Sequence, residues 1–258
     1  MKKVTYSAPS VKKAFKILQL IADSATSLGV SDLARRLKIG KSTVHGITSA
    51  LEEFGVLVRD PIHKKYALGY TLLELSRRSY SKMGFRDVAR VPMERLMEKM
   101  GETVFLGIVN GDHVTILDVV ESHNELKITS PPGTRLPLIA GATGKVFLSQ
   151  FEEKKANEIV QKLGLVRYTS RSVVDPKEFL REVAEVRRKG YAVDDEEYLL
   201  GVRAVASAIR TLSPPPAAIW LVGFTSSLND QKMEKVIVEI RKTAQEISRA
   251  MNPVVRSK

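Results

Sequence analysis

Two short amphipathic stretches joined by a glycine-containing turn place the strongest constraint on how this chain folds. The first, VSDLARRLK, has Ser31 as its expected N-cap and spans about two helical turns. The second, IGKSTVHGITSALEEFG, repeats its apolar residues at intervals of three and four, the period of one helix face: Val44, Ile47, Leu51 and Phe54. Gly55 then supplies the left-handed conformation that often ends a helix. Two helices joined in this way form a helix-turn-helix.

A further helix is expected ahead of this pair, and a β-hairpin after it. The stretch PSVKKAFKILQLIADS opens with Pro9 and Ser10, which signal a helix start, and its expected apolar stripe is Val11, Ala14, Phe15, Leu18, Ile21 and Ala22. The stretch VLVRDPIHKKYALG contains two short apolar runs around a polar turn with a basic tip. A hairpin in this position is the wing of a winged helix-turn-helix.

The outward face of the second helix of the pair carries no acid in its first half. Small polar and basic side chains occupy that half, whereas Glu52 and Glu53 lie at its far end. The N-terminal end of a helix favours anions, and short donors and acceptors can approach phosphates and base edges. The sequence therefore predicts double-stranded DNA as a partner, contacted by Arg35, Lys41, Ser42, Thr43, His45, Gly46, Ser49, His63, Lys64 and Lys65.

The charge balance favours the same partner. The chain has a net charge of +12, and residues 1–80 hold 14 basic against 6 acidic residues, a net +8, while residues 81–258 add +4. No cysteine and only four histidines are present, so we expect no disulfide, no metal centre and no cofactor. The N-terminus lacks an apolar signal segment, and the longest apolar run, AAIWLVGF, is too short to cross a bilayer. We expect a cytoplasmic protein with no membrane partner.

The rest of the chain mixes helices and strands without βαβ alternation, which predicts an α+β fold of two domains. We expect a winged helix-turn-helix domain at residues 1–70, a linker helix at 71–84, and a C-terminal domain with an antiparallel sheet at 85–258. The expected elements of this last domain are a helix ending at Gly101, a hairpin with a type I′ turn at Asn110–Gly111, a strand near 125–130, helices within 141–151 and 175–190, strands at 201–210 and 217–226, and a terminal helix from about Asp230.

Two segments of the C-terminal region are specific in sequence: LPLIAGATGKVFLSQ and VRRKGYAVDDEEYLLGVRAVASAI. Together with the helix-turn-helix they resemble the IclR family of transcriptional regulators, and the resemblance covers both predicted domains in order. It implies a GAF- or profilin-like domain for effector binding and oligomerisation. It also implies homodimers or homotetramers, and DNA binding that is altered by a small, often carboxylate-bearing metabolite.

The resemblance also implies where an effector would bind. The family's pocket falls on Ile128, Leu136, Ala142, Thr143, Asp194, Val202, Ala204, Trp220 and Val222, and the helix start GATGK adds Gly144 because unpaired amides there could hold an anion. Trp220 and Val222 replace the hydroxyl side chains of relatives that bind small polar acids, so we expect an effector with an anionic end and an apolar, aromatic body. Two alternatives to a ligand-binding role stay open. Trp220 fills the cavity as a core residue or serves an interface, and the DDEE run at 194–197 is a solvated turn.

The leading hypothesis is a sequence-specific DNA-binding transcriptional regulator that responds to a small molecule and is not an enzyme. One alternative is an enzyme with an appended DNA-binding module, using Asp194, Glu196 or Thr143 for chemistry. No activated nucleophile or acid–base pair accompanies these residues, so we assign no catalytic residue. The other alternative is an architectural DNA binder without an effector.

Overall fold

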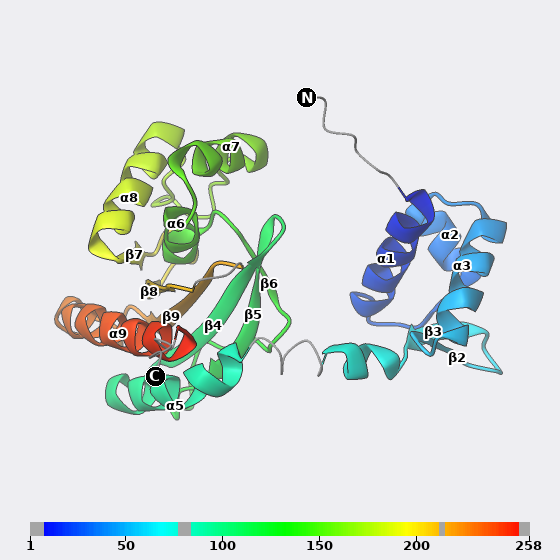
Figure 1. Cartoon of the computed structure of the whole chain (residues 1–258), viewed down its shortest axis with the longest axis horizontal. Coiled ribbons are helices and arrows are strands. Elements are labelled where there is room, and N and C mark those ends of the chain that lie inside the picture. The colour runs from blue at the N-terminus through cyan, green and yellow to red at the C-terminus, as the bar shows by residue number, and fades with distance from the viewer. Residues whose placement is uncertain (1–7, 77–83, 212–214, 253–258) are drawn as a thin grey trace, which may run out of the picture. The chain divides into compact units, whose positions relative to one another are not determined.

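The computed structural model describes residues 8–76, 84–211 and 215–252, and the chain divides into two compact units, Met1–Met83 and Gly84–Lys258 (Figure 1). Each unit has a hydrophobic core of its own. The fold is α+β, as expected, with a helix-turn-helix in the first unit and an antiparallel sheet with helices in the second.

The N-terminal unit packs three helices on a small antiparallel sheet. The helices are α1 (Pro9–Ala22), α2 (Val30–Leu37) and α3 (Lys41–Glu53). The strands β1 (Leu28–Gly29), β2 (Leu57–Arg59) and β3 (Lys65–Leu68) lie in the order β1-β3-β2, so the predicted hairpin is confirmed and gains a third strand. Gly55 follows the C-cap of helix α3 with a φ of 65°, and the amide of Val56 donates to the carbonyl of Leu51.

Three local expectations for this unit are wrong. Gly29, not Ser31, is the N-cap of α2, and its amide donates to Asp32. On α1 the buried residues are Ile17 and Ile21, whereas Val11 and Phe15 are exposed, because apolar residues occupy more than one face of this helix and periodicity alone cannot choose between the faces. The side chain of Phe54 is 71% exposed, since this residue follows the last turn of α3 and no longer continues its buried stripe.

The C-terminal unit is a six-stranded antiparallel sheet between two groups of helices, with α5 and α9 on one face and α6, α7 and α8 on the other (Figure 1). The helices are α5 (Phe85–Met100), α6 (Gly141–Ser149), α7 (Glu153–Leu163), α8 (Pro176–Lys189) and α9 (Asp230–Met251). The strand order is β6-β5-β4-β9-β8-β7. The strands are β4 (Thr103–Asn110), β5 (His113–Val120), β6 (Arg135–Pro137), β7 (Tyr191–Asp195), β8 (Val202–Ile209) and β9 (Ala217–Phe224).

Capping residues and other local sequence signals explain where most of these elements begin and end. Helix α8 begins after Asp175, whose carboxylate accepts the amide of Glu178 at 2.8 Å, and it ends at Gly190 with a φ of 83°. Helix α5 ends at Gly101 in the same left-handed conformation. The predicted helices within 141–151 and 175–190, the strands at 201–210 and 217–226, and the terminal helix are all present.

The remaining expectations need correction. The β4–β5 turn consists of Gly111 and Asp112, one residue later than predicted, and of these two only Gly111 has a positive φ, so the turn is not type I′. Residues 125–130 form no strand, and β6 lies at Arg135–Pro137 instead. Strand β7 and helix α7 were not predicted. Residues 71–76 of the expected linker helix are helical, and residues 77–83 lie outside the described residues.

Candidate functional site

All ten residues predicted to contact DNA lie exposed on the N-terminal unit. Helix α3 is anchored by Val44 and Thr48, which are fully buried, and the Thr48 hydroxyl donates to the hydroxyl of Tyr66 on β3 at 3.2 Å. This anchoring turns the opposite face outward, with Ser42, Thr43, His45, Gly46 and Ser49 exposed along it. The first turn of α3 holds no acidic residue.

Three features of this surface bear on how closely DNA could approach. No heavy atom lies within 4 Å of where a Cβ on Gly46 would be, so the helix surface is open at that point. Arg35 on α2 is bound to Asp32 at 2.9 Å, so it would reach a phosphate as part of an ion pair. Lys38 in the turn between α2 and α3 is also exposed; we did not predict it, although its position in that turn could have indicated it.

The tip of the β2–β3 hairpin is organised by one carboxylate. Asp60 accepts the amides of Ile62 at 2.8 Å and His63 at 3.1 Å, and its second oxygen contacts the ring of His63 at 2.8 Å. These hydrogen bonds, the one from the His63 ring foremost, lower the pKa of Asp60 to about 2. The His63 ring is therefore partly committed to Asp60, whereas Lys64 and Lys65 have exposed side chains.

Nine of the ten residues predicted for the effector site line one cavity in the C-terminal unit, with a volume of about 110 Å³. They come from the loop before β6 and from β6, α6, β7, β8 and β9: Ile128, Leu136, Ala142, Thr143, Asp194, Val202, Ala204, Trp220 and Val222. Six further lining residues were not predicted: Phe105, Ile116, Ser130, Ala140, Tyr198 and Leu199. The alternation of β4 and β5 could have indicated Phe105 and Ile116, but the sequence carries no signal for the loop residues.

The tenth residue, Gly144, does not line the cavity. A Cβ on Gly144 would lie 2.7 Å from the carbonyl carbon of Ile139 and 2.8 Å from its Cα, so this glycine allows α6 to pack against the preceding chain. Its neighbour Lys145 is buried and binds Glu182 at 2.6 Å and Glu197 at 2.5 Å. Burial lowers the pKa of Lys145, but the two carboxylates outweigh burial, and the pKa is raised overall.

Trp220 forms both a wall of the cavity and part of the core. Its ring stacks on Phe105 with centroids 5.6 Å apart and meets Phe147 edge-on at 6.5 Å. Gly107 leaves room for the indole, because a Cβ there would lie 2.7 Å from Cη2 of Trp220. The two alternatives raised by the sequence, core residue and cavity residue, are therefore both true of Trp220.

Asp194 is buried, which corrects the expectation of a solvated turn at 194–197. Its carboxylate accepts the amide of Glu197 at 2.6 Å and also the amides of Tyr198 and Ala142. Gly141 has no Cβ, and any Cβ there would overlap this carboxylate. Burial raises the pKa of Asp194 above its usual value, although the three amides oppose the shift. The start of α6 thus already holds an anion, which is the chain's own carboxylate.

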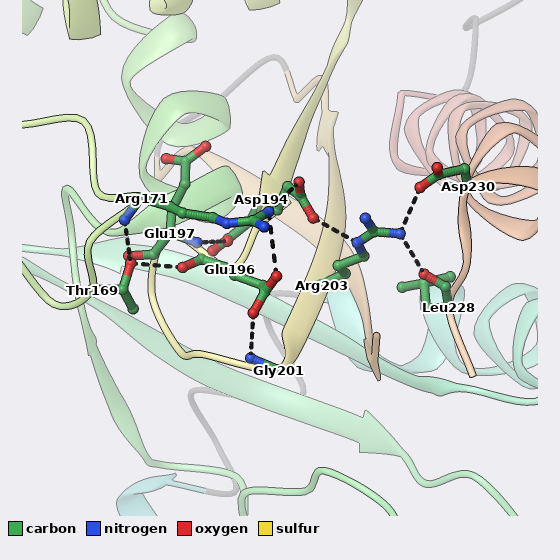
Figure 2. A network of polar contacts seen from close by, with 10 residues as sticks. Thr169, Arg171, Asp194, Glu196, Glu197, Gly201, Arg203, Leu228 and Asp230 are labelled. Carbon is green, nitrogen blue, oxygen red and sulfur yellow. Dashed lines mark hydrogen bonds and ion pairs between the residues drawn. The ribbon is translucent and has the colours of Figure 1, made fainter. Parts of the chain in front are cut away.

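Ion pairs and hydrogen bonds fix the loop at 196–201, which carries Tyr198 and Leu199 to the cavity (Figure 2). Thr169 donates to the carbonyl of Glu196 at 2.7 Å, and Arg171 binds Asp195 at 2.8 Å. On the other side Arg203 bridges Asp195 at 2.5 Å to Asp230, the first residue of α9, at 2.7 Å. One wall of the cavity is therefore joined through side chains to the start of α9.

Comparison with known families decides the identity. Residues 10–61 match the IclR helix-turn-helix domain, and residues 77–249 match the bacterial transcriptional regulator IclR C-terminal domain. The chain belongs to the IclR family. IclR regulators bind DNA and are not enzymes, so the alternative of an enzyme with an appended DNA-binding module is not supported.

Individual IclR relatives match this chain over nearly its whole length. The HTH-type transcriptional regulator BhcR of Paracoccus denitrificans is 32% identical over 95% of this chain and 88% of its own length. The crystal structure of an IclR regulator from Alicyclobacillus acidocaldarius superposes with a TM-score of 0.81 at 25% identity, over 94% of this chain and 98% of that one. An IclR homologue from Microbacterium hydrocarbonoxydans, crystallised with 4-hydroxybenzoate, superposes with a TM-score of 0.79 at 25% identity. The superposition covers 94% of this chain and 98% of the homologue.

Within residues 8–76, 84–211 and 215–252, no helix is long and apolar enough to span a membrane. The same part of the chain holds no group of three or more His, Asp or Glu side chains placed to bind a metal ion.

The raised pKa of Asp194 predicts a pH-dependent stability difference. Between the usual pKa near 3.8 and the raised one, folded Asp194 keeps a proton that the unfolded chain has lost, so the free energy of unfolding falls as pH rises through this window. Asp194→Asn removes this ionisation. We therefore expect the stability of the variant, relative to the unsubstituted chain, to increase with pH from about 4 and to level off above the raised pKa.

The measurement is urea unfolding at a series of pH values, followed by the fluorescence of Trp220, which is the chain's single tryptophan and lies in the same unit. Asp112→Asn is the control. The His113 ring lowers the pKa of exposed Asp112, so this substitution should give a slope of opposite sign below about pH 4 and a flat profile above it. A flat profile for Asp194→Asn would contradict the burial argument.

Proposed function

We propose that the chain is a homo-oligomeric, operator-binding transcriptional regulator whose DNA affinity changes when a small molecule occupies the cavity of its C-terminal unit. The observation that carries this proposal is the convergence of six strands and one helix on a single cavity that contains a buried carboxylate and an aromatic wall. Ligand sites are typically concave and mostly apolar with a few placed polar groups. A cytoplasmic location is part of the same proposal.

The chemistry of the cavity limits the effector to a compact molecule with a ring-sized apolar body. A volume of about 110 Å³ is somewhat below the roughly 150 Å³ that holds benzene in an engineered protein cavity. Trp220, Phe105 and Val222 supply the apolar surface. At the polar end, Asp194 accepts a hydroxyl from the effector. The hydroxyl of Ser130, in the loop before β6, donates to the acid group of the effector.

A monocyclic hydroxy acid satisfies each of these requirements. The ligand of the Microbacterium hydrocarbonoxydans relative, 4-hydroxybenzoate, has a ring, a carboxylate and a hydroxyl, and it is therefore the first compound to test here. The direct experiment is a DNA mobility assay on the fragment upstream of this chain's own gene, with and without 4-hydroxybenzoate, alongside thermal unfolding with the same compound. If neither 4-hydroxybenzoate nor other monocyclic acids change either readout, the proposal fails in favour of an architectural DNA binder.

Val222→Ser tests the apolar wall with little disturbance of the core. Val222 is only partly buried, unlike Trp220, whose removal would leave a large void. Exchanging two methyl groups for a hydroxyl should weaken the binding of an aromatic acid about tenfold and should favour smaller, more polar acids. DNA affinity without ligand should not change. The control is Val238→Ser, the same exchange at an exposed position on α9. If calorimetry shows that the two variants change the affinity for the aromatic acid equally, Val222 does not contact the effector.

The DNA interface follows from the exposed face of α3 and the hairpin. We place the N-terminal half of α3 in the major groove, where Lys41, Ser42, His45 and Ser49 reach base edges, and Lys64 and Lys65 on flanking phosphates. The open surface at Gly46 permits close approach to the sugar-phosphate backbone.

Replacing both wing lysines, Lys64→Ala with Lys65→Ala, should weaken binding to all duplex sequences alike. Because each phosphate contact releases condensed counterions, the dependence of log K on log salt should flatten by about one to two units. Lys154→Ala with Lys177→Ala removes the same charge from exposed positions on α7 and α8 and should leave the slope unchanged. A wing variant that loses preference for one operator while keeping its salt slope would show that these lysines do not contact phosphate.

The proposed homo-oligomer, a homodimer or homotetramer, follows from the size of the DNA contact. One α3 helix reaches too few base pairs to specify a site in a genome, and a symmetric pair of helices reads two half-sites. Sedimentation of the chain with its operator should show at least two copies per site. A monomer that binds a single half-site with full affinity would refute the proposal.

A further inference from the structure

A second concave site lies in the C-terminal unit, separate from the effector cavity. It is a groove of about 670 Å³ between α8 and α9, where β7 and β8 also lie (Figure 1), and it shares no lining residue with the cavity described above. Six basic residues line it, from α8, from the end of β8 and from α9: Arg187, Arg188, Lys189, Arg210, Arg241 and Arg249. No aspartate or glutamate is among the lining residues.

Most of this positive charge has no internal partner. Lys189 binds Glu185 at 2.7 Å, and Arg187 donates to the carbonyls of Ser149 and Phe151. The other four arginines form no ion pair with any carboxylate that the structure describes: Arg188, Arg210, Arg241 and Arg249. The segments outside the described residues contain no aspartate or glutamate in their sequence.

Helix-end electrostatics explain only part of the cluster. Basic residues in the last turn of a helix are favoured by the helix dipole, which accounts for Arg249 at the end of α9 and for three residues at the end of α8: Arg187, Arg188 and Lys189. Arg210 instead follows strand β8, and Arg241 lies in the middle of α9 with its guanidinium 5.7 Å from the ring centre of Tyr191. These two arginines reach the same groove from different elements without a helix end to stabilise them.

We propose that this groove binds a small phosphorylated molecule with two or more phosphate groups. Guanidinium groups match phosphate oxygens in bidentate geometry, and several of them around one concavity suit a multiply charged anion better than a single carboxylate. The volume is within the roughly 300–1,000 Å³ of ordinary small-molecule sites, and Gln245 adds an amide donor to the lining. The groove shares no residue with the effector cavity or with the proposed DNA-binding surface.

The test is calorimetric titration of the full chain, without DNA, with sodium tripolyphosphate and with fructose 1,6-bisphosphate. Ionic strength is matched with potassium chloride, and inorganic phosphate serves as the comparison with a single phosphate group. We expect saturable binding of one equivalent per chain for at least one of the two probes, and weaker binding of inorganic phosphate. Arg210→Ala with Arg241→Ala should weaken the binding about tenfold or more.

The matched control is Arg167→Ala with Arg181→Ala, which removes the same charge from exposed positions of the same unit outside the groove and should change the affinity little. If the groove variant fails to fold, Arg188→Ala with Arg249→Ala replaces it. Equal losses in groove and control variants, or no saturable binding of either probe, would overturn the proposal. A lower salt slope for the groove variant on a 30-base-pair duplex would overturn it as well, since the groove would then be a DNA contact.

Discussion

The C-terminal unit depends on one buried carboxylate. Asp194 at the end of β7 accepts amides from the first turn of α6 and from the loop at 196–201, so a single side chain ties a strand, a helix and a loop together. An unpaired charge in this environment would be costly, and the amides offset part of that cost. Gly141 is required because any side chain there would displace the carboxylate. The cavity exists where these three elements meet, and its shape follows from this attachment.

In the N-terminal unit, packing holds the polar face of α3 in the solvent. Thr48 and Val44 hold α3 to the small core, and the Thr48–Tyr66 hydrogen bond joins the helix to the wing strand β3. The helix and the hairpin are thereby fixed relative to each other. Acidic residues are absent from the leading turn of α3, and Asp60 in the hairpin is used internally to shape the turn.

The sequence predicted elements whose signals are local and missed those that depend on distant partners. The period of α3, the caps of α8 and the apolar runs of β8 and β9 are readable in short windows, and all four elements are present. Strand β1 has only two residues and exists because β3 pairs with it. The family resemblance located nine lining residues of the cavity, but the burial of Asp194 could not be read from the acidic run around it, because the amides that hold it come from positions 142, 197 and 198.

Packing and ligand choice are coupled in this fold. The stack of Phe105 on Trp220 stabilises the core and at the same time sets one boundary of the cavity, so a larger effector would have to disturb that stack. Such a pair contributes about 0.5–1.5 kcal/mol beyond the area it buries, which a ligand would need to offset from its own contacts. The loop at 196–201 forms another boundary, but Arg171, Thr169 and Arg203 hold it. Under the proposed function, the effector range would therefore change most easily at partly buried Val222, where a new side chain alters the cavity without breaking either constraint.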